Sequence, residues 1–295
     1  MKKTIIFITA LLFAVFLFAE DTDLVSKRFY PSQVKSISTN FSAGKVTLKA
    51  DNTEQISVII TGDKEASTPT VKVVNGVLTV KTGLLSSVKK KHNVTISVPY
   101  GISFDEIKIL NFSANAEVQN INAASLTITT SSGKINISDS VFKKFIQIAG
   151  ASGKINLSNI QSENVTLSAV GGQLEVNKCQ SSTFRLEAMS GELNCSKINT
   201  ESFNLQCTSG KISLSLDNMI SEDSFIKTGS GKVILSLPEN NGYTALVNST
   251  SGKFTDEFTG TTVSMGHDIK SVYKDGYSTI KLDSVSGDIT ISKQQ

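Results

Sequence analysis

One short sequence motif recurs through the chain at nearly constant spacing. Residues 130–138 read TSSGKINIS, and residues 150–158 read GASGKINLS. The motif returns at a column of glycines: Gly133, Gly153, Gly172, Gly191, Gly210, Gly231, Gly252 and Gly287, with Ala114 in the glycine's place in a weaker copy. The steps are 19 to 21 residues up to Gly252. A fixed period of this length is typical of a solenoid, in which each repeat stacks on its neighbours.

Apolar and polar residues alternate on both sides of each glycine. Ile146 and Ile148 precede Gly153 by seven and five residues, and Ile155 and Leu157 follow it by two and four. This alternation predicts strands with one buried face, and the small residues one and three positions before each glycine suit a tight corner. The chain is therefore expected to be all-β: a parallel β-helix or β-solenoid with coils of about 20 residues. We expect it to be right-handed, as crossovers between parallel strands usually are.

The first 19 residues have the pattern of a secretory signal peptide. Lys2 and Lys3 precede an apolar run that Ala19 closes. The run is shorter than the roughly 20 residues that cross a bilayer, which makes an uncleaved anchor the alternative. We therefore expect an exported protein, periplasmic, on the cell surface or secreted, and no later segment reads as a membrane span.

The charge balance changes once this segment is set aside. Its two lysines, taken from 29 basic residues, leave 27 against 26 acidic ones. A nearly neutral chain gives no support to a nucleic-acid partner.

The remaining chain divides into two parts. Residues 20–112 predict irregular coils and the cap of the solenoid, and residues 113–295 predict the regular stack. The step from Gly252 to Gly287 is 35 residues, which predicts a loop insertion near 256–277 that contains Tyr273 and Tyr277. Insertions in solenoids often carry function, and a cap without a binding role is the alternative.

Lysine follows the corner glycine in many repeats. The candidate residues are Lys134, Lys154, Lys211, Lys232 and Lys253. Stacking would place them about 5 Å apart in a row that could contact an anionic envelope glycopolymer. Gln173, Glu192 and Asp288 interrupt the column, and outward lysines also serve solubility, so a solvated face is the alternative.

Other chemistry is sparse. His92 and His267 lie far apart without neighbouring ligands at metal spacing, so no metal or cofactor is predicted. Cys179, Cys195 and Cys207 are odd in number and are interpreted as small buried hydrophobes, not a disulfide framework.

These features resemble one known family. The Ser-Gly-Lys-Ile-Asn repeats, together with an N-terminal sector ending in VTISVP at 94–99, are similar to the "putative adhesin" family of bacterial envelope proteins. The resemblance spans about 29–293 and implies a β-helical solenoid at or outside the envelope, with no catalytic residues to transfer.

The sequence therefore predicts a non-catalytic exported interaction scaffold. An envelope glycopolymer or another surface protein is the expected partner, and the oligomeric state is open. The alternative is a polysaccharide-active β-helix enzyme, which would need convergent acidic groups and aromatic platforms. The chain has no tryptophan and no outward acidic column.

Overall fold

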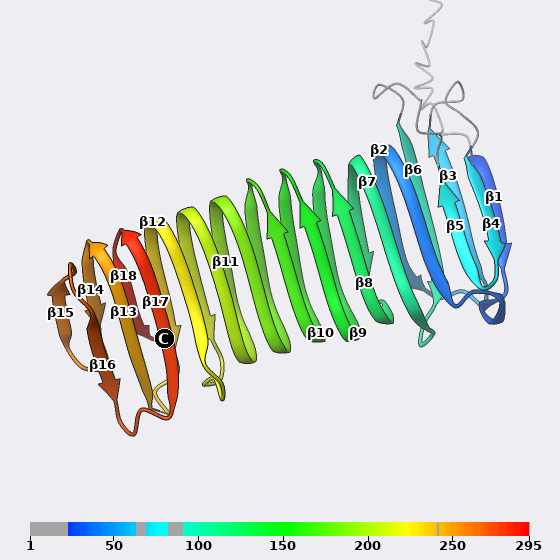
Figure 1. The fold of residues 1–295 in the computed structure, drawn as a ribbon. Helices are drawn as coiled ribbons and strands as arrows, with labels where there is room; N and C mark the ends of the chain where they lie inside the picture. Colours follow the sequence, from blue (N-terminus) through cyan, green and yellow to red (C-terminus); the bar gives the residue numbers. More distant parts are fainter. Residues whose placement is uncertain (1–22, 63–68, 82–90, 241, 295) are drawn as a thin grey trace, which may run out of the picture.

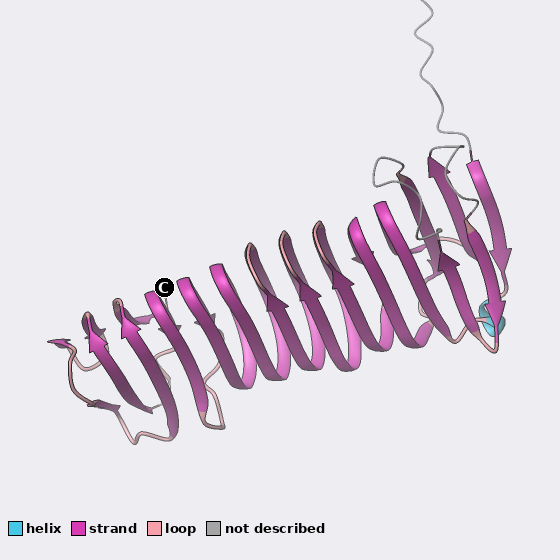
Figure 2. Cartoon of the chain, turned by 45° about the horizontal axis from the view of Figure 1, so that its top comes forward, coloured by secondary structure: helices cyan, strands magenta, loops and turns pink. Residues whose placement is uncertain are grey.

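The computed structural model describes residues 23–62, 69–81, 91–240 and 242–294. The expected signal peptide, 1–19, lies outside these ranges. The all-β prediction is confirmed: the described residues form 18 strands in one open sheet and a single short 3-10 turn, η1 (Pro31–Gln33). Figure 1 shows an elongated, solenoid-like stack running from β1 to β15, and Figure 2 shows that loops are confined to its edges and ends. Within the described ranges, no helix is long or apolar enough to cross a membrane.

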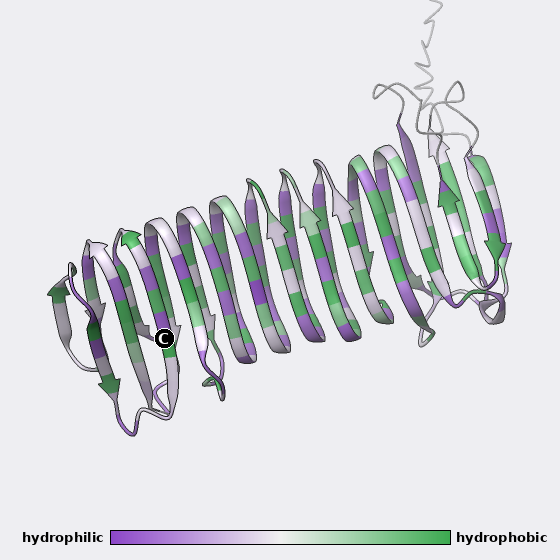
Figure 3. Ribbon diagram, viewed as in Figure 1, coloured by the Kyte–Doolittle hydropathy of each residue, from purple (hydrophilic) through white to green (hydrophobic). Residues whose placement is uncertain are grey.

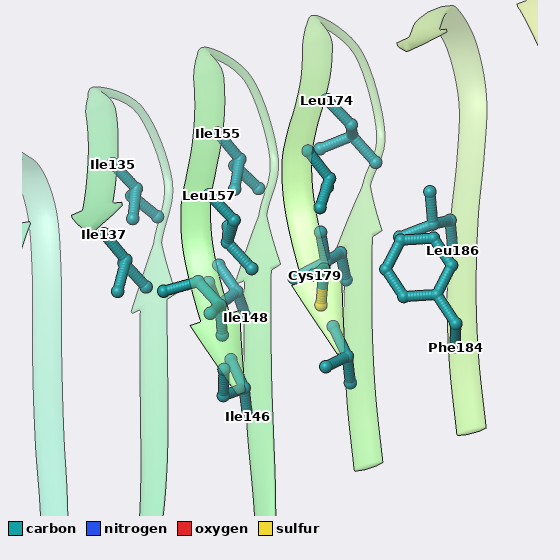
Figure 4. Close-up of a cluster of buried hydrophobic side chains, with 14 of the residues drawn as sticks. Ile135, Ile137, Ile146, Ile148, Ile155, Leu157, Leu174, Cys179, Phe184 and Leu186 are labelled. Atoms are coloured by element: carbon teal, nitrogen blue, oxygen red, sulfur yellow. The ribbon is translucent and has the colours of Figure 1, made fainter. Parts of the chain in front are cut away.

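The middle of the stack is a continuous parallel ladder. It consists of β7 (Ser103–Gln119), β8 (Asn122–Thr130), β9 (Lys134–Gly150), β10 (Lys154–Ala169), β11 (Gln173–Leu216) and β12 (Ser224–Leu237). Ile155 of β10 pairs with Ile135 of β9 and Leu174 of β11, so equivalent repeat positions stack. All three side chains are buried, and Figure 4 shows them pointing to the same interior side. The alternation of hydropathy along each strand is visible in Figure 3, and it explains why these segments are strands with one buried face.

The repeated glycines form the first corner of each coil. All eight have φ between +118° and +144°. A Cβ atom on Gly172 would lie 1.9 Å from the carbonyl oxygen of Gly153 in the neighbouring coil. Glycine is therefore required both by the left-handed backbone and by the close approach of adjacent coils.

A second corner lies six residues after the first. The residues there are not glycine, yet φ is between +51° and +56° at Asn120, Asp139, Asn159, Lys178 and Lys197. Asparagine and aspartate tolerate this conformation better than other residues, and Asn159 Nδ2 donates a hydrogen bond to Asp139 Oδ1 at 2.8 Å. This second corner was not predicted from the sequence.

The N-terminal end of the stack is closed by antiparallel strands. Its elements are β1 (Asp23–Phe29), β2 (Ser36–Asp51), β3 (Ile56–Gly62), β4 (Thr70–Val74), β5 (Val77–Lys81) and β6 (His92–Pro99). β2 pairs in parallel with β7 on one side and with β5 and β6 on the other. Three antiparallel pairs complete this end: β4 with β5, β3 with β6, and β1 with β3. They cover the outer edge of the stack.

The coils at the C-terminal end are not stacked in sequence order. The elements are β13 (Tyr243–Ser251), β14 (Lys253–Asp256), β15 (Thr261–Ser264), β16 (Ile269–Tyr273), β17 (Ser278–Ser286) and β18 (Ile289–Lys293). β17 pairs in parallel with both β12 and β13, and β18 with both β12 and β14. Figure 1 shows the red β17 between the yellow β12 and the orange β13. The glycine column therefore runs from Gly231 to Gly287 and then to Gly252.

The segment expected as a loop near 256–277 contains two strands. β15 pairs antiparallel with β14, and β16 pairs antiparallel with β13. These strands satisfy the outer edge of the last parallel coil, which would otherwise present unpaired backbone groups. The backbone groups at this edge need hydrogen-bond partners, which explains why the extra residues form strands.

A buried carboxylate organises the interior of this end. Asp256 is fully buried; Tyr243 Oη donates to its Oδ1 at 2.7 Å, and Ser271 Oγ donates to its Oδ2 at 2.6 Å. The backbone N–H of Phe258 donates to Oδ1 at 3.0 Å. Burial, and then the adjacent carboxylate, raise the pKa of Tyr243. These three donors satisfy acceptor sites of the buried carboxyl group, which offsets the cost of removing it from water.

Candidate functional site

The lysine column is partly neutralised by glutamates on adjacent coils. Lys154 Nζ lies 2.6 Å from Glu175 Oε1, and Lys211 Nζ lies 3.5 Å from Glu192 Oε1. Lys134, Lys232 and Lys253 form no ion pair with any residue that the structure describes. The predicted residues thus share one side of the stack but differ in their availability to a ligand.

The interleaved C-terminal coil also breaks this column. The register that pairs Val233 with Ile289 brings Lys232 level with Asp288, and Asp288 Oδ1 accepts a hydrogen bond from the backbone N–H of Lys253 at 3.0 Å. Asp288 therefore lies between two lysines that the sequence had placed next to each other. The cations form short runs and not a continuous ladder.

A groove of about 420 Å³ lies on the other side of the same corners. We call it the corner groove; it is lined by Ser168, Ala169, Val170, Glu187, Ala188, Met189, Gln206, Cys207, Thr208, Lys227, Thr228, Gly229 and Val285. It crosses four consecutive repeats and reaches the interleaved coil through Val285. Small residues form much of its floor, which is why it is hollow.

The rim of the corner groove is apolar although it faces water. Val170, Met189 and Val285 are 53%, 60% and 61% exposed. Exposed apolar side chains gathered in a hollow are typical of an interaction site, whereas single exposed ones are ordinary. The long Met189 side chain can also adapt its shape to a ligand.

Two charged groups of different availability lie in the corner groove. Glu187 accepts a hydrogen bond from Arg185 Nε at 2.9 Å. Lys227 has no ion pair among the residues described. The groove therefore offers an apolar surface with one available cation.

This groove was not predicted from the sequence, although a signal was present. Position −2 relative to the corner residue carries a large apolar residue in four of the nine copies (Phe112, Val170, Met189 and Val285) and a small or polar residue in the others, while position −1 is always small. A large apolar residue at an exposed corner has no structural purpose of its own. That column would have indicated the surface.

A polar ridge runs along the second corner. Gln161, Gln180 and Asn199 continue the line of Val141, with hollows of about 360 and 410 Å³ on either side. Lys178 and Lys197 border the first hollow. This surface can donate and accept hydrogen bonds, and Val141 is the large apolar side chain exposed on it.

The histidines and cysteines do not converge on a site. His92 is buried in β6, and His267 is exposed in the turn between β15 and β16. No group of three or more His, Cys, Asp or Glu residues that could hold a metal ion occurs in the part of the chain described. The three cysteines are buried and unpaired, and burial raises the pKa of Cys179 to about 12, so its thiol is unreactive.

The comparisons with solved structures identify the fold. A "putative adhesin" from Parabacteroides distasonis is 11% identical; the match covers 92% of this chain and 96% of that one, with a TM-score of 0.51. A "putative lipid binding protein" from the same organism is 12% identical over the same shares, with a TM-score of 0.53. At these identities the likeness shows a common fold. A comparison with curated proteins finds no match.

A family assignment follows from the sequence match. The model of the Toastrack DUF4097 family matches residues 34–292. The match takes in every strand from β2 to β17 and most of β18, including all the glycine corners. This protein therefore belongs to the Toastrack DUF4097 family.

Proposed function

We propose that this protein is a non-catalytic interaction scaffold that is exported to the cell envelope or surface. We also propose that the stack is a right-handed solenoid with coils of about 20 residues. The corner groove is the observation that carries it, because it places exposed apolar side chains on a rigid parallel stack. The fold that the chain shares with a "putative adhesin" supports the same class of function.

The ligand that fits the corner groove has an apolar portion. The rim of Val170, Met189 and Val285 offers no hydrogen bonds, so a bare polyanion would gain little there. An apolar segment of another surface protein would bury this rim, and Lys227 could pair with a carboxylate of that segment. We therefore propose another surface protein as the partner at this groove.

The surface beside the polar ridge favours binding over sugar cleavage. Glu163 and Glu201 border the second hollow, two coils apart, and both are exposed. The general acid of a glycosidase normally lies in a site that is shielded from water. Exposed carboxylates at this position lack that shielding, which supports the scaffold over the enzyme.

The first test removes the apolar rim. We expect the triple substitution Val170→Ser, Met189→Ser and Val285→Ser to weaken binding to isolated envelopes by at least about 100-fold. Three exposed side chains contribute roughly 1 kcal/mol each on burial, and each 1.4 kcal/mol is tenfold.

The matched control replaces exposed valines away from the groove. Val74→Ser, Val141→Ser and Val272→Ser should leave binding unchanged. Protease-treated envelopes should lose binding if the partner is a protein, whereas delipidated envelopes should lose it if an acyl chain occupies the groove. Equal binding of the two triple variants would contradict the proposal.

We further propose that Lys134, Lys154, Lys211, Lys232 and Lys253 contact an anionic glycopolymer. The three lysines without ion pairs favour this second contact. Replacing Lys134, Lys154, Lys211 and Lys232 with glutamine should abolish its salt-sensitive component, since exposed charges are screened beyond about 10 Å at 0.1 M salt. Lys143→Gln with Lys144→Gln is the control. Binding that is unchanged both by salt and by the quadruple substitution would contradict the lysine contact and leave the corner groove as the only proposed binding site.

A further inference from the structure

The interleaved coil occupies a slot between two other coils. We call residues 278–293, which form β17 and β18, the closing coil, and the space between β12 and β13–β14 the slot. The closing coil is paired in parallel on both edges, and Ile280, Leu282, Ile289 and Ile291 are all buried. Without the closing coil, the facing edges of β12 and of β13–β14 would have unpaired backbone groups, and the apolar interior between them would be exposed.

The slot selects its occupant through the glycine corner. A Cβ atom on Gly287 would lie 1.8 Å from the carbonyl oxygen of Gly231, and one on Gly252 would lie 2.3 Å from that of Gly287. An occupant therefore needs a glycine in this register with alternating apolar residues on both sides. The closing coil of any copy of this chain meets that requirement.

Side chains add specificity on both sides of the slot. Ser292 Oγ lies 2.8 Å from Ser236 Oγ, and Lys293 Nζ lies 3.1 Å from Glu239 Oε1. On the opposite side, the backbone N–H of Lys293 donates to Glu257 Oε2 at 3.2 Å. A second copy would reproduce every one of these contacts, because they join the closing coil to the body of the molecule.

A short, constrained hinge joins the closing coil to the body. β16 and β17 lie on opposite edges of β13, and only residues 274–277 connect them. Lys274 has φ +52° and Gly276 has φ +65°, and a Cβ atom on Gly276 would lie 2.7 Å from Thr244 Oγ1. Of these two residues, only Lys274 is a non-glycine residue in the left-handed region, which strains the hinge. Short hinges under strain favour exchange of the element they carry.

We propose that copies of this chain exchange their closing coils, so that the slot of one molecule holds residues 278–293 of a second copy. Reciprocal exchange gives a closed dimer with the same interior contacts and a relaxed hinge. The closing coil is hydrogen-bonded on both edges once folded, so exchange takes place while the chains fold together. The proposal does not depend on what the corner groove binds.

The test uses two full-length chains, each with one new cysteine and a different tag. Ser236→Cys and Ser292→Cys lie on neighbouring strands across the slot, so a disulfide between two chains reports exchange. The chains are mixed in denaturant with reductant, refolded together at high concentration and then oxidised. The native cysteines are buried after folding. The matched control mixes Ser215→Cys with Ser236→Cys, which are neighbours in β11 and β12 and remain within one molecule.

We expect a disulfide-linked heterodimer from the first mixture, at several times the level of the control. Gly276→Val should raise the dimer fraction measured by light scattering, because the added side chain increases the strain in the hinge of the monomer. Inserting the four residues Gly-Ser-Gly-Ser after Asp275 should lower the dimer fraction. This second variant tests the hinge even if the Gly276→Val variant fails to fold. A heterodimer yield equal to the control, or a dimer fraction that the insertion leaves unchanged, would overturn the proposal.

Discussion

The sharpest test of the stack compares two adjacent glycines. Gly172 has φ +121°, and an added Cβ atom would lie 1.9 Å from the carbonyl oxygen of Gly153. Gly171 has no positive φ, and its nearest contact would be Ser190 Oγ at 3.7 Å. Alanine at the two positions changes composition identically but meets opposite environments.

The expected cost of Gly172→Ala has two parts. A non-glycine residue in this backbone region costs about 1–3 kcal/mol. The same Gly153 oxygen accepts a hydrogen bond from the N–H of Gln173 at 3.2 Å, and moving the coils apart loses about 0.5–1.5 kcal/mol more. We therefore expect a loss of about 2–4 kcal/mol, or a Tm lower by roughly 5–15 °C.

Gly171→Ala should be neutral or stabilise by up to about 1 kcal/mol, since alanine restricts the unfolded chain. Urea unfolding followed by circular dichroism measures both variants. Equal midpoints would show that the corner does not require glycine, and the account of coil stacking would be refuted.

Three further predictions concern the core and the cap. Tyr243→Phe should cost about 1.5–3 kcal/mol in urea unfolding, because the buried carboxylate loses a donor, whereas the exposed Tyr277→Phe should be neutral. Leu193→Asp should lower the free energy of unfolding by several kcal/mol, because it buries a charge, whereas Asn194→Asp should lower it only a little. Similar shifts in Tm for the two variants would show that the buried and exposed faces of this strand have been assigned wrongly. Burial raises the pKa of Cys179 to about 12 from 9.0, so its contribution to stability is complete below pH 9 and falls by about 1.4 kcal/mol per unit from there to pH 12. Cys179→Ala should show a shallower alkaline decline in the urea midpoint, and identical slopes would contradict this.

The buried face of each strand could be predicted from the sequence because its signal is local. Alternation around Ile155 and Leu174 identifies the inner side without knowledge of any partner strand, and both residues are buried. The left-handed corners at Lys178 and Lys197 could not be predicted in this way, since lysine has no preference for that backbone conformation.

The order of the C-terminal coils could not be predicted for a different reason. Every coil carries the same corner, so the sequence is compatible with Gly287 following Gly252 at the end of the column or lying between Gly231 and Gly252, as it does. The choice depends on which arrangement leaves no edge unpaired, and that is a property of the whole end of the molecule. The corner groove, by contrast, had a readable signal in the apolar residues at position −2.

Because the glycine corner is repeated from coil to coil, the length of this molecule can change in steps of one coil. Each coil from Gly153 to Gly210 presents the same glycine corner to both neighbours, while the antiparallel strands at the two ends occur in no other coil of the described chain. Duplication of one repeat there would add about 4.8 Å to the rod and leave both ends intact. Selection could therefore adjust the distance between the two ends of such a protein by gaining or losing whole coils, without redesigning either terminus.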